Sequence, residues 1–376
     1  MKQLQLTGRQ LITGPGALSA LKNLDFTRAL LITGSQSMFR SGVIDRIRTL
    51  LSPRGLVKIY SGIGANPTCA EVEAGLSEMH AFQPDLIIAV GGGSAIDAAK
   101  AMLLFYEYPS LNFQNVFQSS LPQTRTKTTF VAIPSTSGTA SEVTHVTVIT
   151  FPGKKQKLAI KTEAIRPDIA ILDGEICLSL PSHIAAETGM DALTHALECY
   201  TNHSKDTFTD LLAEGAIRGI LSYLPSSVHE GTLESRQKMH EYACMAGMAF
   251  SNAGLGMVHG ISHAFSAFYH TAHGLANAII LPYVLEYNRQ DGWVAAQLAK
   301  LSALTGGDIV AQVKTLSQQL GIPPCLRDTG IPEADFLRDE AQLIEGSMLG
   351  STAVNPIPMT IGTITPIIRS AYYGNK

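Results

Sequence analysis

Short apolar runs alternate with amphipathic helical patterns over the first half of the chain. An apolar run at 29–34 is followed by a helical pattern at 42–51, and a second run at 56–62 is followed by another at 70–82. The segment 85–105 then passes from strand to helix through a glycine turn. Strands that alternate with helices in this way predict a mostly parallel sheet with helices on both faces.

The pattern changes beyond residue 180. Helical periodicity dominates there, starting with SHIAAETGMDALTHALECY at 182–200, and the last strand-like run of the first half is DIAILDG at 168–174. We therefore predict two domains, an α/β domain over 1–180 and an all-α domain over 181–376.

Composition and charge narrow the classes of partner. The chain has 376 residues, 45% of them hydrophobic, and a net charge of -3, which gives no reason to expect binding to nucleic acid or to an anionic membrane. We find neither a secretory signal pattern nor an apolar run of about 18 residues, so we predict a cytoplasmic protein whose partners are small molecules or copies of itself. The five scattered cysteines form no CxxC pair, which argues against a disulfide framework or a thiolate zinc site.

A glycine-rich turn follows the third strand-like run. The segment AVGGGSAID at 89–97 closes a strand and opens a helix, with Ser94 predicted as the N-cap. Glycines let a ligand approach the backbone, and a helix N-terminus favours a pyrophosphate. However, Ile96 stands where the Rossmann fingerprint has its third glycine, so a tight turn without a ligand is the alternative.

A second polar loop follows the run TFVAI. The segment IPSTSGTASEVT at 133–144 supplies six Ser and Thr hydroxyls beside small residues. Hydroxyls and free backbone N–H groups suit phosphate or ribose, although an ordinary Ser/Thr-rich turn has the same composition.

Two pairs of side chains in the second half have the spacing of metal ligands on a helix. Asp191 and His195 lie four residues apart, as do His259 and His263, so each pair occupies one helical face. Imidazole and carboxylate suit a divalent transition metal. The alternative for a single pair is a helix cap or a hydrogen-bonded core histidine.

The segment 258–273 contains four of the chain's 11 histidines. In one continuous helix, His259 and His273 would lie roughly 21 Å apart at about 1.5 Å rise per residue, whereas metal–nitrogen bonds are only about 2 Å long. Either the first pair alone binds, or the chain turns between them. The weak helix formers at 269–271 and the following Gly274 make a break plausible.

Four segments resemble the iron-containing (group III) alcohol dehydrogenase family in the same order and spacing. They are GGGSAIDAAK, PSTSGTASEVT, GMDALTHALE and GLGMVHGISHAFSAFYHTAHGLANAIILP, and the similarity extends from LITGPGAL near the N-terminus to NPIPMT at 355–360. The resemblance implies the dehydroquinate synthase-like fold, with an N-terminal Rossmann-like α/β domain, an all-α C-terminal domain and one divalent metal in the cleft between them.

The resemblance also implies a role for each metal-competent residue. His263 matches a histidine beside the metal, near nicotinamide and substrate, and we interpret it as a proton relay. His270 falls at a position that varies within the family, so we do not count it among the implied ligands. Three imidazoles and one carboxylate suit Fe(II) or Zn(II), which would act as a Lewis acid on the substrate oxygen while hydride passes to or from nicotinamide C4. The implied ligands are Asp191, His195, His259 and His273.

Cofactor contacts follow from the same resemblance. It assigns the pyrophosphate to Gly92, Gly93 and Ser94, the nicotinamide and ribose to Thr136, Thr139 and Thr144, and the lining of the cofactor cleft to Asn66, Asp97 and Lys157. An aspartate in the first turn of a helix and an Asn-Pro turn also have ordinary structural explanations.

The end of the first strand bears on the choice of nicotinamide cofactor. Many NAD-preferring relatives carry an aspartate there, which bonds the ribose 2′-OH and repels a 2′-phosphate. This chain has Gly34 instead, followed by Ser35, Ser37 and Arg40. Glycine removes the repulsion and the serines can hydrogen-bond a phosphate, so we predict that NADP(H) is favoured over NAD(H).

Together these features predict a metal-dependent oxidoreductase that transfers hydride between NAD(P)(H) and a small alcohol or aldehyde. A hydroxyacid–oxoacid transhydrogenase and a glycerol dehydrogenase-like enzyme are alternatives within the superfamily. A metal-dependent hydrolase or lyase is an alternative from another class, but it leaves the glycine turn and the hydroxyl loop unexplained. The resemblance further implies a homodimer that assembles through N-terminal strands.

Overall fold

The structure is a computed structural model that describes residues 3–34, 36–154 and 156–374. The chain forms two compact units. The first comprises residues 1–180 and 232–244, and the second comprises 181–231 and 245–376. Helix α7 (Leu233–Ala253) contributes its first part to one unit and its last part to the other.

A six-stranded parallel sheet forms the centre of the first unit, as the alternating pattern predicts. Its order is β1-β8-β5-β4-β2-β3, and every described neighbouring pair is parallel. The inner strands β2, β4 and β5 are almost entirely apolar because helices cover both faces of the sheet. The strands are β1 (Gln10–Thr13), β2 (Arg28–Gly34), β3 (Leu56–Ile63), β4 (Leu86–Gly91), β5 (Thr129–Pro134) and β8 (Ile169–Leu172).

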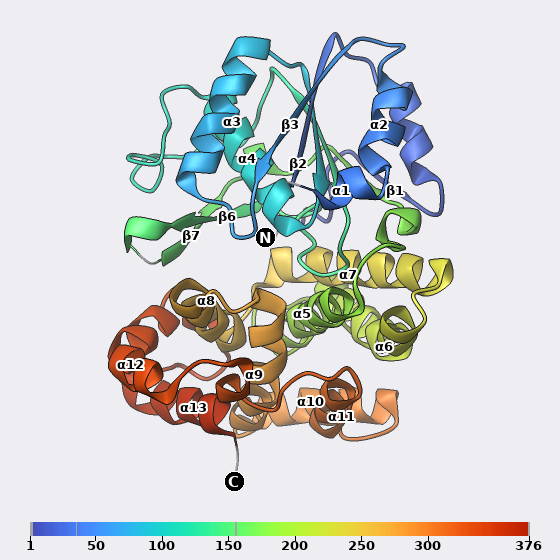
Figure 1. The fold of residues 1–376 in the computed structure, drawn as a ribbon. Coiled ribbons are helices and arrows are strands. Elements are labelled where there is room, and N and C mark those ends of the chain that lie inside the picture. The colour runs from blue at the N-terminus through green and yellow to red at the C-terminus, as the bar shows by residue number, and fades with distance from the viewer. Residues whose placement is uncertain (1–2, 35, 155, 375–376) are drawn as a thin grey trace. The chain divides into compact units, whose positions relative to one another are not determined.

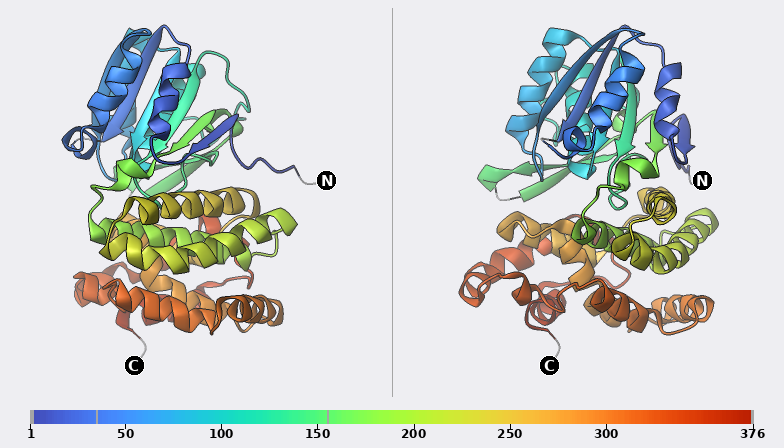
Figure 2. Two further views of the ribbon diagram at one scale, coloured as in Figure 1. Left: turned by 90° about the vertical axis from the view of Figure 1, so that its right-hand side faces the viewer. Right: turned by 45° about the vertical axis from the view of Figure 1, so that its right-hand side comes forward.

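Two hydrophobic cores lie on opposite faces of this sheet (Figures 1 and 2). One core joins the sheet to α3 (Cys69–Phe82) and α4 (Gly93–Glu107). The other joins it to the 3-10 helix η1 (Ala17–Asn23) and α2 (Val43–Leu51). The remaining elements of this part of the chain are the short helix α1 (Ser37–Arg40), the antiparallel ribbon β6 (Val146–Phe151) and β7 (Gln156–Lys161), and the 3-10 helices η2 (Pro152–Lys154), η3 (Glu163–Ile165) and η4 (Gly174–Cys177).

The prediction that Ser94 caps helix α4 is wrong. The helix begins two residues earlier than this cap requires, at Gly93, so the N-cap is Gly92, which supplies no side-chain cap. Ser94 lies inside the first turn, where its hydroxyl accepts a hydrogen bond from the Asn66 N–H at 3.3 Å. The physical reason is that three consecutive glycines let the chain enter the helix directly from the strand.

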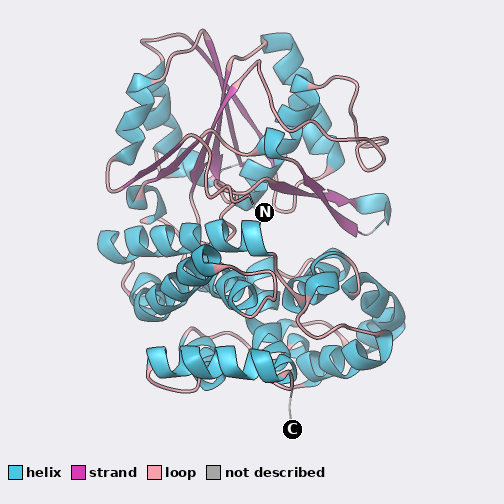
Figure 3. Cartoon of the chain, turned by 180° about the vertical axis from the view of Figure 1, so that it is seen from behind, coloured by secondary structure: helices cyan, strands magenta, loops and turns pink. Residues whose placement is uncertain are grey.

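The described part of the second unit consists of helices and loops, while all the strands drawn in Figure 3 belong to the first unit. Helix α5 packs against α6 and α9, and α8 packs against α9 and α12. No described helix combines the length and the apolar character that a membrane crossing requires. The helices are α5 (Ser182–Tyr200), α6 (Thr207–His229), α8 (Met257–Tyr269), α9 (His273–Asn288), α10 (Gly292–Thr305), α11 (Ile309–Gln319), η5 (Leu326–Thr329), α12 (Glu333–Ser347), η6 (Gly350–Val354) and α13 (Ile361–Tyr373).

Candidate functional site

Helix α5 carries the first pair of metal-competent side chains. Asp191 and His195 are one helical turn apart, and both are buried in the second unit. The Nε2 atom of His195 lies 3.9 Å from Oδ1 of Asp191. The i,i+4 spacing therefore places carboxylate and imidazole on one face, as the sequence predicts.

A turn in the chain brings the other two histidines to the same carboxylate. Helix α8 ends at Tyr269, His270 adopts a left-handed conformation with φ 55, and α9 begins at His273. This break confirms the predicted chain turn. As a result, Nε2 of His259 and Nε2 of His273 lie 3.8 and 3.7 Å from Oδ1 of Asp191.

Gly274 lets the start of α9 approach α5 closely. A Cβ atom at this position would lie 2.3 Å from the backbone oxygen of Glu187, so any larger residue would push α9 away from α5. The chain turn lies before Gly274, as predicted, and begins at His270. Gly274 lies within the first turn of α9, where its function is close packing.

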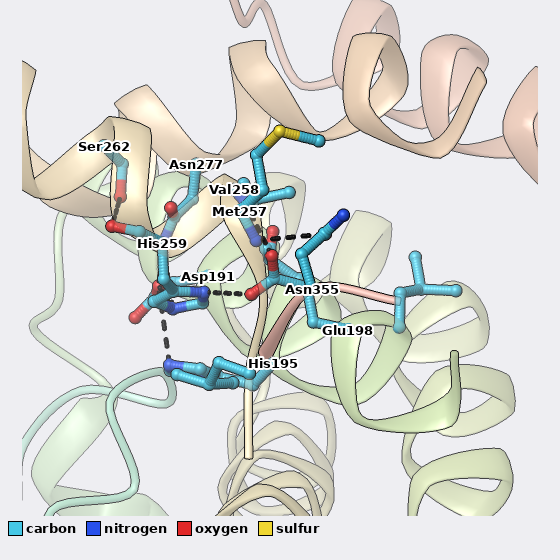
Figure 4. Close-up of polar contacts among 12 residues, drawn as sticks. Asp191, His195, Glu198, Met257, Val258, His259, Ser262, Asn277 and Asn355 are labelled. Carbon is cyan, nitrogen blue, oxygen red and sulfur yellow. Dashed lines mark hydrogen bonds and ion pairs between the residues drawn. The ribbon is translucent and has the colours of Figure 1, made fainter. Parts of the chain in front are cut away.

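The donor set has the chemistry and spacing of a transition-metal site. Ligand atoms of Asp191, His195 and His259 all lie within 4.8 Å of one another (Figure 4). Two ligands about 2.1 Å from a tetrahedral ion are about 3.4 Å apart, which is close to the distances from Asp191 to the imidazole nitrogens. One carboxylate and three imidazoles fit Fe(II) or Zn(II).

Asn277 indicates that this group of atoms attracts an electropositive partner. Its amide nitrogen donates to Oδ1 of Asp191 at 2.6 Å and lies 3.2 Å from Nε2 of both His259 and His273. The amide oxygen is buried and has no hydrogen-bond partner among the described residues. Directing the NH₂ group toward the carboxylate and imidazoles therefore leaves a buried acceptor unpaired, which is costly.

Sequence reasoning missed Glu198, Ser262 and Asn277. Glu198 Oε2 lies 2.5 Å from Nδ1 of His259, and the Ser262 hydroxyl lies 3.3 Å from Nδ1 of His273. Helical spacing could have identified two of them, because Glu198 is seven residues after Asp191 and Asn277 is four after His273. Glu198, Val258 and His259 appear together in Figure 4.

His263 lies beside the histidine group on α8. Its ring stacks on that of His273 with centroids 4.8 Å apart and an interplanar angle of 12°. The centroid distance to His259 is 6.1 Å. His263 is partly exposed, whereas His259 is buried. The structure thus brings His263 next to the candidate ligands.

In the first unit, the glycine turn and the hydroxyl loop are in contact. They follow the neighbouring strands β4 and β5, whose carboxyl ends lie at the same edge of the parallel sheet. A Cβ at Gly93 would lie 2.7 Å from Thr139 Oγ1, and one at Gly92 would lie 3.6 Å from Thr136 Oγ1. The structure therefore brings together two of the predicted glycines and two of the predicted threonines.

Asn66 connects this group to the ribbon. Its backbone has a positive φ of 58, and its N–H bonds the Ser94 hydroxyl at 3.3 Å. Lys157 on β7 donates to Asn66 Oδ1 at 2.8 Å. Burial lowers the pKa of Lys157 to about 8, against the opposing attraction of Asp97.

Asp97 and Thr144 belong to a buried polar network around Lys100. The Lys100 ammonium donates to the hydroxyls of Ser141 and Thr144, both at 3.0 Å. Asp97 accepts from the Ser141 hydroxyl and from the Val148 N–H. Burial lowers the pKa of Lys100 to about 8, while the Asp97 charge opposes that shift. Sequence reasoning missed Lys100, although a lysine one turn after Asp97 was visible in the motif.

The residues expected to recognise the adenosine part of the cofactor lie at the C-terminal end of β2 and just after it. Gly34 is the last residue of β2, and Ser37 is the first of α1. The Arg40 side chain bonds the Gln36 side chain. Ser35, which the sequence analysis also names, lies outside the described residues.

Two family models match the chain. The model described as iron-containing alcohol dehydrogenase matches residues 8–174. The model described as the C-terminal part of the Fe-containing alcohol dehydrogenase family matches residues 185–372.

Individual relatives agree with these matches. The chain is 40% identical to the NADPH-dependent butanol dehydrogenase of Clostridium saccharobutylicum, over 98% of this chain and 97% of that protein. It is 36% identical to an aldehyde-alcohol dehydrogenase of Streptococcus pneumoniae, over 94% of this chain but only 44% of that protein. The solved iron-containing alcohol dehydrogenase of Thermococcus thioreducens is similar with a TM-score of 0.92 and 34% identity, over 100% of both chains.

Proposed function

The chain belongs to the iron-containing alcohol dehydrogenase family, and on this basis we propose that it transfers hydride between a nicotinamide cofactor and a small alcohol or aldehyde. One observation carries the proposal: the Nε2 atoms of His195, His259 and His273 all lie 3.7 to 3.9 Å from a single oxygen of Asp191. Three imidazoles around one carboxylate, with the side chain of His273 24% exposed and the other three side chains buried, are suited to a divalent cation.

We assign the ion, Fe(II) or Zn(II), to this group of four residues. When bound, it supplies Lewis acidity toward the oxygen of the alcohol or aldehyde. The Asp191 carboxylate is the one negative charge among the four ligands, so the protein balances only part of the charge of a dication. This leaves the site selective for an oxygen that carries or develops negative charge.

His263 is assigned to proton transfer. It stacks on His273 at 4.8 Å and remains partly exposed, so its imidazole can exchange protons with water. In alcohol oxidation it accepts the hydroxyl proton and passes it to solvent, and in aldehyde reduction it works in the opposite direction. We place it beside the ligands and not among them.

The cofactor site is assigned to the glycine turn and the hydroxyl loop of the first unit. Gly92, Gly93 and Ser94 lie at the N-terminus of α4, where backbone N–H groups and the helix dipole favour a pyrophosphate. The nicotinamide and ribose are assigned to Thr136, Thr139 and Thr144 of the facing loop, and the lining of the cofactor cleft to Asn66, Asp97 and Lys157.

NADP(H) is proposed as the preferred cofactor. Gly34 and Ser37 at the end of β2 present no carboxylate to a 2′-phosphate, and Arg40 is close in sequence. The relative that is 40% identical is an NADPH-dependent butanol dehydrogenase, which supports the same preference and a small aliphatic substrate. The ratio of kcat/KM for NADPH and NADH, measured with butanal, tests this part of the proposal.

A homodimer is also proposed. Strand β1 is one of the two edge strands of the sheet, and only β8 pairs with it among the described residues. An edge strand with free backbone groups is suited to pairing with a second copy. Light scattering on the purified protein measures its oligomeric state directly.

The test of the activity combines metal analysis with an assay of NAD(P)H absorbance. Protein stripped of metal and reloaded anaerobically with Fe(II) or Zn(II) should reduce C2–C6 aldehydes, whereas the stripped protein should not. His195→Ala should lose both metal and turnover. His229→Ala, at an exposed position on α6, should keep both and serves as the matched control. Full turnover by metal-free protein would overturn the proposal.

A further inference from the structure

Glu198 is a buried carboxylate that the proposed reaction does not use. It lies on α5 one turn after His195 and is only 5% exposed. A buried carboxylate is unfavourable unless hydrogen bonds compensate for its lost hydration. The partners of its two oxygens therefore reveal what the side chain does.

Both oxygens accept hydrogen bonds from the first turn of α8. Oε1 accepts from the Val258 N–H at 2.7 Å, and Oε2 lies 2.5 Å from Nδ1 of His259. The residue at the N-cap of α8, Gly256, supplies no side-chain cap. Glu198 on α5 thus caps the N-terminus of α8. It also holds the imidazole of His259 in the first turn of α8 (Figure 4).

We propose that Glu198 is a positioning residue that keeps the proton of His259 on Nδ1, so that the Nε2 lone pair is directed toward Asp191 and the metal. An ionised carboxylate only accepts hydrogen bonds, so its contact with Nδ1 requires that nitrogen to carry the proton. The inference rests on the proposed metal site. Carboxylates that hold ligating histidines in this way raise metal affinity.

His273, the other histidine that the chain turn brings to Asp191, has a different partner at Nδ1. Nδ1 of His273 lies 3.3 Å from the Ser262 hydroxyl, which itself donates to the His259 carbonyl at 3.2 Å. While the hydroxyl donates to the His259 carbonyl it can only accept from Nδ1, but it can rotate and donate to Nδ1 instead, so it does not fix one tautomer of His273. Glu198 therefore acts on His259 in a way that Ser262 cannot act on His273.

Glu198→Gln separates this function from packing because the two side chains have the same shape. If the glutamine oxygen keeps the Val258 N–H, its NH₂ group faces Nδ1 of His259 and moves the imidazole proton to Nε2. If the amide flips to keep the His259 contact, its NH₂ group faces the Val258 N–H. The first orientation keeps both contacts only by moving the proton to Nε2, and the second loses the bond to the Val258 N–H. Only a carboxylate keeps both bonds with the proton on Nδ1.

The experiment measures metal affinity of the apo-protein by competition with a chromophoric chelator, using Zn(II). We expect Glu198→Gln to bind Zn(II) about 10- to 100-fold more weakly than the wild type. Glu187→Gln removes a half-buried carboxylate from the same helix and should leave the affinity unchanged. Equal affinity of Glu198→Gln and wild type would overturn the proposal.

One further variant distinguishes tautomer control from helix capping. Asn355 accepts from the Met257 N–H at 3.3 Å, so Asn355→Ala removes a cap of the same turn without touching His259. It should lower the thermal midpoint of the apo-protein with less than a threefold change in Zn(II) affinity. If it weakens Zn(II) binding as much as Glu198→Gln does, capping alone explains the effect and the proposal is wrong.

A double-mutant cycle with His259→Ala provides the last test. If Glu198 acts through His259, the effect of Glu198→Gln on Zn(II) affinity should disappear in the His259→Ala background. An undiminished effect there would refute action through His259. The proposed function fails separately, if the wild type itself holds no divalent metal.

Discussion

The imidazole rings of His259 and His273 lie with their centroids 5.3 Å apart, although fourteen positions separate the two residues in the sequence. Both Nε2 atoms face Oδ1 of Asp191. This relationship depends on the turn at 270–272 and on the close contact of Gly274 with the backbone of α5.

Gly274→Ala should therefore damage the metal site without changing any ligand. The added Cβ would lie 2.3 Å from the Glu187 oxygen, and relieving this clash moves the start of α9. We expect a loss of about 1–3 kcal/mol in the free energy of unfolding, typical of overpacking, together with weaker metal binding. Denaturant unfolding and metal analysis measure the two effects. Gly346→Ala on α12, where the nearest atom would be 3.5 Å away, is the matched control and should bind metal normally.

His263→Ala should separate proton transfer from metal binding. Removing a general acid–base group costs about 10²–10⁴-fold in turnover, whereas the metal content should stay at the wild-type level. Steady-state kinetics and metal analysis of the same preparation provide both values. Loss of metal in this variant would show that His263 supports the site itself, contrary to the proton-transfer assignment.

Gly93→Ala should affect the cofactor site more than Gly92→Ala. A Cβ at Gly93 would lie 2.7 Å from Thr139, but one at Gly92 would lie 3.6 Å from Thr136, which is an ordinary contact. We expect Gly93→Ala to raise the cofactor Kd at least tenfold by separating the glycine turn from the hydroxyl loop, and Gly92→Ala to retain the loop packing. Fluorescence titration with NADPH measures the Kd. Similar behaviour of the two variants would contradict the packing argument.

Gly34→Asp should shift the cofactor preference toward NAD(H). The position has room for a side chain, since the nearest atom to an added Cβ is the Ile63 oxygen at 3.5 Å. A carboxylate there repels a 2′-phosphate, so kcat/KM for NADPH should fall at least tenfold, or about 1.4 kcal/mol. Gly34→Asn tests shape without charge and should change the preference less. An unchanged ratio would show that the end of β2 does not contact the adenosine ribose.

The buried His240 should make stability depend on pH. Its Nδ1 lies 2.9 Å from the Ser137 hydroxyl and its Nε2 lies 3.1 Å from Cys177 Sγ. Burial, helped by the nearby Arg236, lowers the pKa of His240 to about 4, while the Pro134 backbone, Asp173 and Glu241 oppose the shift.

Between pH 4 and 6.5 the unfolded chain therefore binds a proton that the folded His240 does not. The stability that the neutral imidazole contributes is complete above pH 6.5 and is lost as the pH falls toward 4. His240→Asn should flatten this decline in denaturant unfolding measured across that range. The lowered pKa of His145 acts in both proteins, so it cancels in the comparison. Parallel pH profiles of the two proteins would rule out a contribution from His240.

Local patterns in the sequence determined the elements and the chemistry they carry. The apolar run at 86–91 forms a strand because its residues are buried on both faces of the sheet, and the i,i+4 spacing places Asp191 and His195 on one face of α5. Helical rise also showed that His259 and His273 can share one ion only if the chain turns between them, because a straight helix separates them too far. These conclusions depend only on the geometry of single elements.

Tertiary packing decided which side chains complete the sites. Glu198 reaches His259 only because α8 begins against α5, and Asn277 faces three ligands only because α9 begins at His273. Ser94 is not the N-cap because the glycine turn enters the helix two residues earlier, and Lys100 is buried because the hydroxyl loop closes over it. Helical spacing can nominate Glu198 and Asn277 as candidates, but their partners lie far away in the chain, so only the tertiary structure shows which side chains they contact.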